Sequence, residues 1–126
     1  MNHRSKTGVL GEDIASRFLL GKGYDILDRN YRSGYGEIDI IAKDAQSIVF
    51  VEVKTVSRGT HHSSVPHETY RPEDNVHEKK LQMVIQTGER YLASQNDDSD
   101  WRVDVVAVEL EKESLKATIR HLRGVS

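Results

Sequence analysis

The chain has 126 residues, no cysteine and a formal net charge of -2, from 18 Lys and Arg against 20 Asp and Glu. This length fits one domain with a single core, which we expect to span residues 1–126. The absence of cysteine excludes disulfide bonds and thiolate metal sites. The net charge is uninformative about nucleic acid, but the charges along the chain form only a weak basic excess, six basic against four acidic groups in residues 1–35. This distribution argues modestly against a protein that binds nucleic acid tightly without specificity.

The sequence also bears on location. It starts without the apolar stretch of a secretory signal, and no apolar run approaches the roughly 20 residues that cross a bilayer. We therefore expect a cytoplasmic protein with no membrane partner.

Periodicity and turn residues predict the order helix, three strands, helix, two strands. In chain order, the expected elements are a helix at 8–22, strands at 24–32, 36–42 and 48–54, a helix from 75, and strands at 101–110 and 115–122. Gly23 is predicted to end the first helix in the left-handed conformation. One mixed α/β sheet flanked by helices is the simplest architecture for this order.

Both helices are expected to be amphipathic. The predicted buried arc of the first helix contains Leu10, Gly11, Ile14, Ala15, Phe18 and Leu19. Glu12 lies at the edge of this arc, so its side chain could reach the sheet. The second helix is predicted to bury Leu81, Val84, Ile85, Gly88, Tyr91 and Leu92.

The segment from Val56 to Asn75 shows no period and is predicted to be a long loop. It directly follows the strand that carries Lys54. We expect it to become ordered over bound DNA and to help select the substrate.

Asp39, Glu52 and Lys54 are polar residues inside two apolar, strand-like runs. Burying a carboxylate among β-branched side chains is costly unless a cation or a hydrogen-bond donor lies beside it. Two carboxylates with a lysine could hold a divalent metal ion, a combination that suggests phosphodiester chemistry. The alternative is a cross-strand cluster of salt bridges on a half-exposed face of the sheet.

The register of the predicted hairpin can be derived from its turn. If the turn comprises Asp44 to Ser47, Lys43 pairs with Ile48, and Asp39 then lies opposite Glu52. A slip of one residue would move one set of carboxylates to the other face.

The same register places Glu37 opposite Lys54, so that both carboxylates, Glu37 and Lys54 share a face. Glu37 could pair with Lys54, tune that lysine or bind metal. Further along the chain, Asp104 shares a face with Val106 and Val108, so it is either a buried partner of a basic group or close to the site.

Several stretches resemble the YraN family of predicted endonucleases, and the resemblance covers nearly the whole chain. The matching stretches are 11–15, 23–27, 29–32, Gly36-Glu37-Ile38-Asp39-Ile40-Ile41, Val49-Phe50-Val51-Glu52-Val53-Lys54, 79–81, 91–92 and 102–108. That family is similar to the PD-(D/E)XK nuclease superfamily and, in layout, to archaeal Holliday junction resolvases. The resemblance implies a restriction-endonuclease-like fold and action on DNA, including branched or repair intermediates.

Carried over residue by residue, the resemblance implies that Asp39 is the strand aspartate, Glu52 the second metal ligand and Lys54 the catalytic lysine. Glu12 matches the helical glutamate that completes the metal site, and the implied ion is Mg²⁺ or Mn²⁺. The sequence departs from the motif at one point, because 36–38 reads Gly-Glu-Ile and lacks the proline.

Four basic residues are candidate contacts to DNA phosphates: Arg32, Arg58, Lys79 and Lys80. Lys79 and Lys80 lie near the start of the second helix, where backbone N–H groups favour anions, although a solvated helix face explains them equally well. The short chain and near-neutral charge favour a homodimer or a protein partner. The alternative function is a nucleic-acid-binding or protein-interaction module with a nuclease-like scaffold and no turnover.

Overall fold

The computed structural model describes residues 5–34, 36–58, 78–111, 113–114 and 116–125. Its elements, in chain order, are α1 (Lys6–Gly21), β1 (Asp25–Ser33), β2 (Gly36–Lys43), β3 (Ile48–Arg58), α2 (Glu78–Ser94), β4 (Trp101–Glu111) and β5 (Lys116–Leu122). The predicted order of elements and the mixed α/β class are confirmed. No helix in these ranges is both long and apolar enough to cross a membrane.

The ends of α1 follow from local sequence. The Ser5 side chain accepts a hydrogen bond from the Gly8 backbone N–H at 2.9 Å and so caps the first turn. The helix therefore begins at Lys6, earlier than the start at Gly8 that the sequence predicts. At the other end, Gly23 adopts a φ of 93°, which confirms the predicted left-handed cap.

The five strands form one sheet in the order β1-β2-β3-β4-β5. All neighbours are antiparallel except β3 and β4, which pair in parallel along their whole lengths. A parallel pair needs a long crossover connection, and α2 lies within the segment that supplies it.

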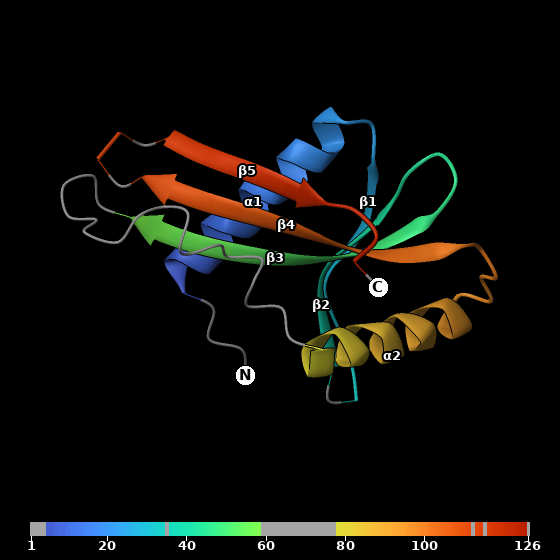
Figure 1. Cartoon of the computed structure of the whole chain (residues 1–126). Coiled ribbons are helices and arrows are strands. Elements are labelled where there is room, and N and C mark those ends of the chain that lie inside the picture. Colours follow the sequence, from blue (N-terminus) through green and yellow to red (C-terminus); the bar gives the residue numbers. More distant parts are fainter. Residues whose placement is uncertain (1–4, 35, 59–77, 112, 115, 126) are drawn as a thin grey trace.

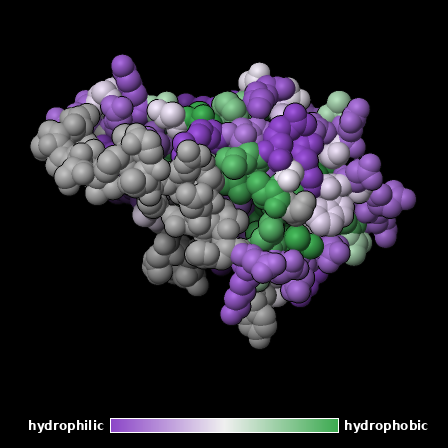
Figure 2. Space-filling view, in the orientation of Figure 1, coloured by the Kyte–Doolittle hydropathy of each residue, from purple (hydrophilic) through white to green (hydrophobic). Residues whose placement is uncertain are grey.

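The two helices cover opposite faces of the sheet, α1 across β3 and β4 and α2 across the end formed by β1 and β2 (Figure 1). Side chains alternate accordingly along β3: Val49 and Val51 pack on the α1 side, whereas Ile48 and Phe50 pack on the α2 side. On the face seen in Figure 2, hydrophobic side chains gather near the centre, and hydrophilic ones lie above, below and to the right of them.

The predicted buried arcs of the helices are partly confirmed. In α1, Gly11, Ala15 and Leu19 are buried, but Leu10 remains 49% exposed, so that prediction is wrong. The helix meets β3 through Gly11, where an added Cβ would overlap the Thr55 side chain, and Leu10 lies outside that contact. In α2, the predicted positions are buried apart from Leu81 and Ile85, which are partly buried.

The predicted register of β2 and β3 is confirmed, since Lys43 pairs with Ile48. Within the described residues this ladder ends at the pair Ile40 and Val51, after which β2 pairs with β1 only. The β1–β2 hairpin bends away from the other strands at this point (Figure 1). Glu37 therefore pairs with Arg32 of β1, and its predicted position opposite Lys54 is wrong.

The structure also corrects the start of the predicted loop. Residues 56–58 belong to β3, because they pair in parallel with residues 109–111 of β4. The rest of that loop, and the predicted start of the second helix at Asn75, lie outside the described residues.

Candidate functional site

A pocket of about 310 Å³ lies where β2 separates from β3, bordered by the first turns of α1 and α2. Glu12 of α1, Asp39 of β2, Glu52 and Thr55 of β3, and Lys80 of α2 all line it. Three predicted site residues, Glu12, Asp39 and Glu52, thus come together from three separate elements.

Asp39 occupies the first position of β2 beyond the β2–β3 ladder. Its Oδ2 accepts a hydrogen bond from the Val53 backbone N–H at 2.8 Å. The carboxylate thus takes the place that a strand carbonyl would occupy on the edge of β3. This contact fixes the orientation of Asp39 beside Glu52.

Glu52 is a buried carboxyl group, only 4% exposed. Burial, reinforced by the negative charge of Asp39, raises the pKa of Glu52 to about 7, although Lys80 opposes the shift. Lys80 Nζ lies 2.5 Å from Glu52 Oε2. A basic group from α2 thus already contacts the pair of carboxylates.

Lys54 is half-buried and follows Glu52 by two residues in β3. Burial lowers the pKa of Lys54, and the neighbouring Lys80 ammonium lowers it further, against the pull of Glu52 and Asp39. The predicted lysine therefore belongs to the same electrostatic cluster as the two carboxylates.

Glu12 reaches the pocket because α1 lies very close to β3. A side chain at Gly11 would overlap the side chain of Thr55, so only glycine permits this approach. Glu12, the next residue, is 4% exposed, and its Oε1 lies 3.7 Å from Arg29 Nη2. The helix thereby presents a third carboxylate to the pocket.

The donor chemistry of the pocket suits a hard divalent cation, since carboxylate oxygens are the preferred protein ligands of Mg²⁺. Asp39 and Glu52 fit this role because they are adjacent. The raised pKa of Glu52 means that ionising it beside Asp39 is unfavourable unless positive charge is added. Across the described ranges, however, no three His, Cys, Asp or Glu side chains form a group able to hold a metal ion. Glu12 therefore lines the pocket without joining a three-carboxylate group.

The four predicted phosphate contacts occupy different environments. Lys80 lies in the pocket, and Lys79 is exposed beside it on α2. Arg32 is 46% exposed and lies 3.6 Å from Glu37. Arg58 pairs with Glu109 at 2.9 Å, with both side chains only 15% exposed.

Some pocket residues were not foreseen from the sequence. The start of α1 contributes Ser5 and Thr7, and β3 contributes Thr55. The signal available for α1 was Ser5 itself, since serine is a preferred helix-capping residue. The contact between Lys80 and Glu52 had no sequence signal, because it joins two elements separated by residues 59–77.

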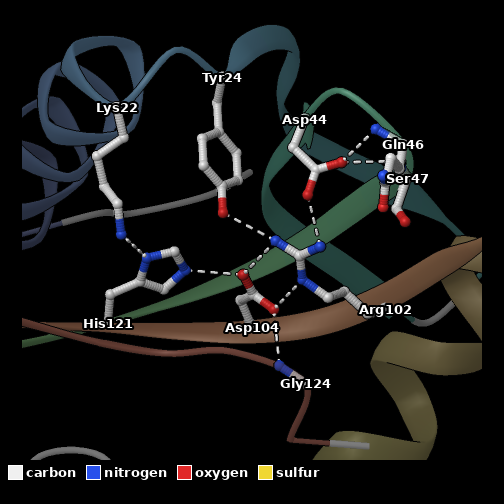
Figure 3. Close-up of polar contacts among 9 residues, drawn as sticks. All are labelled: Lys22, Tyr24, Asp44, Gln46, Ser47, Arg102, Asp104, His121 and Gly124. Atoms are coloured by element: carbon white, nitrogen blue, oxygen red, sulfur yellow. Dashed lines mark hydrogen bonds and ion pairs between the residues drawn. The ribbon is translucent and has the colours of Figure 1, made fainter.

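A second polar cluster lies on the α1 side of the sheet and is centred on Asp104 and Arg102 of β4 (Figure 3). Asp104 is fully buried, and it accepts hydrogen bonds from Arg102, His121 and the Gly124 backbone N–H. Of the two alternatives for Asp104, the structure selects the buried partner of basic groups.

Arg102 extends the same cluster to other elements. It donates to Asp44 in the turn between β2 and β3 at 2.6 Å and to the Tyr24 hydroxyl at 2.8 Å. Lys22, at the end of α1, donates to His121 Nδ1 at 2.9 Å, which leaves Nε2 to donate to Asp104. These contacts tie the turn, α1 and the end of the chain to β4, a structural role.

Comparison with known proteins gives consistent relatives. Residues 11–108 match the sequence profile described as "Uncharacterised protein family UPF0102". A UPF0102 protein of Alkaliphilus oremlandii is 41% identical over 122 residues, covering 94% of this chain and 96% of its own length. One of Syntrophus aciditrophicus is 40% identical over 117 residues, covering 92% and 86%.

Among solved structures, the chain is similar to Pyrococcus furiosus SfsA, determined in complex with Ca²⁺, with a TM-score of 0.37 and 15% identity. The match covers 95% of this chain and 64% of the SfsA chain.

Proposed function

The chain belongs to the UPF0102 family, and we propose that it is a metal-dependent phosphodiesterase with a restriction-endonuclease-like fold that cleaves DNA. The observation that carries this proposal is the pocket at the split between β2 and β3. There, Asp39 and Glu52 lie side by side, and the ammonium of Lys80 contacts Glu52. Carboxylates that could hold a metal ion, beside an ammonium that could neutralise phosphate charge, suit phosphodiester hydrolysis.

In this proposal Asp39 and Glu52 hold Mg²⁺ or Mn²⁺, and Glu12 supports them from α1. The bound ion would supply an acidified water and neutralise charge on the phosphate. The Val53 N–H keeps Asp39 oriented toward the pocket, the part that outer hydrogen-bond partners play around metal ligands.

Lys54 is proposed as the catalytic lysine, which orients the nucleophile or stabilises the negative charge that develops on the phosphate. Its burial matters, because an ammonium acts more strongly where water is excluded. Arg32, Lys79 and Lys80 are proposed to contact DNA phosphates around the pocket. A phosphate contact by Arg58 remains a prediction. The homodimer or protein partner also remains a prediction.

The alternative is a nucleic-acid-binding or protein-interaction module without turnover. Two observations favour it: Lys80 already pairs with Glu52, and no three-carboxylate group forms among the residues that the structure describes.

Cleavage assays separate the two functions. Wild type and Asp39→Asn are incubated with Mg²⁺, Mn²⁺ or EDTA on single-stranded, duplex, flapped and four-way DNA. If the protein is an enzyme, wild type but not Asp39→Asn should cleave at least one substrate, and only when metal is present. Binding without cleavage under every condition would favour the module.

A further inference from the structure

Lys80 holds a position that conflicts with cation binding. Its Nζ lies 2.5 Å from Glu52 Oε2, and the Glu52 side chain is only 5% exposed. Glu52 belongs to β3 and is held in the sheet, whereas Lys80 lies in the first turn of α2 with a side chain that is 45% exposed. Of the two partners, Lys80 is the one that can move away.

A divalent cation on Glu52 would place further positive charge beside this ammonium. Like charges in a partly buried pocket repel more strongly than in bulk solvent. A Glu52 carboxylate whose charge is shared with a cation is therefore a poorer partner for Lys80, and the two positive groups compete for it. Lys54 sharpens the conflict, because it is a second ammonium close to Lys80.

We propose that Lys80 is a built-in counter-ion for Glu52, which it releases when a divalent cation binds, and that its freed ammonium then contacts a DNA phosphate. The inference rests on the proposed function and adds regulation to the same site. Without metal, the Lys80 ammonium neutralises the charge of Glu52 and so reduces the repulsion between Glu52 and Asp39. With metal, Lys80 becomes available at the mouth of the pocket, so DNA binding is coupled to metal binding.

Calorimetric titration of Mn²⁺ into metal-free protein at pH 8 tests the first step. We compare wild type with Lys80→Met, which keeps the length of the side chain but removes its charge, and with Lys80→Arg, which keeps a positive charge. Lys43→Met is the matched control, because it removes one positive charge from an exposed position at the far end of β2.

Removing the competing ammonium should tighten Mn²⁺ binding by roughly tenfold in Lys80→Met, whereas Lys80→Arg and Lys43→Met should stay within about twofold of wild type. Detectable Mn²⁺ binding by Lys80→Met but not by wild type would also support competition between Lys80 and the cation. Equal or weaker binding by Lys80→Met, with wild type binding normally, would overturn the role of Lys80 and leave the proposed function standing. If neither protein binds Mn²⁺, both the metal site and the inference are wrong.

DNA affinity tests the second step. Fluorescence anisotropy with a short labelled duplex is measured in EDTA and in Ca²⁺, a cation chosen to allow binding without turnover. Wild type should gain affinity in Ca²⁺, and Lys80→Met should lose most of that gain while differing less than about threefold from wild type in EDTA. An equal gain in both proteins would show that Lys80 does not contact phosphate after its release.

Discussion

The Val53 backbone N–H donates a hydrogen bond to Asp39 Oδ2 at 2.8 Å, at the point where β2 leaves β3. A strand edge that would otherwise expose an unpaired donor is thus satisfied by a site carboxylate. The contact explains how Asp39 can lie in a largely apolar strand and still face a pocket. It also links the shape of the sheet to the position of the proposed metal ligand.

Asp39→Asn should keep the fold and lose the metal site. The asparagine carbonyl can still accept from Val53, so the free energy of unfolding should change by less than about 1 kcal/mol. The neutral amide is a poorer ligand than a carboxylate, so calorimetric titration should show loss of Mn²⁺ binding. Equal Mn²⁺ affinity in both proteins would contradict a metal site at Asp39.

Lys54→Ala should lower the cleavage rate on the order of 100-fold or more, because the lysine acts on the nucleophile or the developing charge. Its Mn²⁺ affinity and melting temperature should remain close to wild type. The measurements are single-turnover cleavage, calorimetry and thermal melting. A large fall in melting temperature with unchanged activity per folded molecule would make Lys54 structural instead.

Glu52→Gln should stabilise the metal-free protein at pH 8 by about 1 to 2 kcal/mol, because it removes a buried charge that Asp39 repels. Saturating Mn²⁺ should then stabilise wild type, by about 2.7 kcal/mol at a free concentration 100 times Kd, but not the variant. Urea unfolding with and without Mn²⁺ measures both effects. The idea fails if the variant is the less stable protein without metal and gains equally from Mn²⁺.

Asp44 should make the free energy of unfolding depend on pH in the acid range. Although burial opposes it, hydrogen bonds from the Gln46 and Ser47 backbone and from Arg102 lower the pKa of Asp44 from 3.8 to about 2. Because the folded-state pKa is the lower one, the stabilisation is present above about pH 4 and is lost as pH falls toward 2.

Asp44→Asn should therefore cost about 1 to 2 kcal/mol at pH 6, after discounting for solvent screening, and progressively less below pH 4. Urea unfolding at several pH values measures the difference. Asp98→Asn, at an exposed position, is the control and should show a smaller effect. A constant cost from pH 6 to pH 3 would argue against this linkage.

Gly11→Ala should destabilise the protein by about 1 to 3 kcal/mol, because its Cβ would overlap the Thr55 side chain. The displaced α1 would also move Glu12 in the pocket. Gly21→Ala is the matched control on the same helix, because its added Cβ would meet nothing within 4 Å beyond the adjoining helix backbone and chain neighbours, and it should be neutral or slightly stabilising. Similar melting temperatures for the two variants would contradict the close approach at Gly11.

How much of the molecule could be predicted depends on the range of the interactions involved. The order of elements, the cap at Gly23 and the pairing of Lys43 with Ile48 rest on neighbours in sequence, and all three are confirmed. The position of Glu37 was wrong because a strand pattern does not reveal where two strands separate. The strand end at Arg58 was missed because β4, distant in sequence, decides it.

The same division applies to the site. By itself, the sequence determined the register of β2 and β3, because side-chain alternation and a short turn leave one register that buries the apolar residues. That register brings Asp39 near Glu52, one position beyond the last pair of the ladder. Only the tertiary structure decided that Glu12 borders the same pocket, that the Val53 N–H donates to Asp39 and that Lys80 forms an ion pair with Glu52. These contacts join elements through packing and charge, which no local pattern encodes, so they had to be observed in the folded chain.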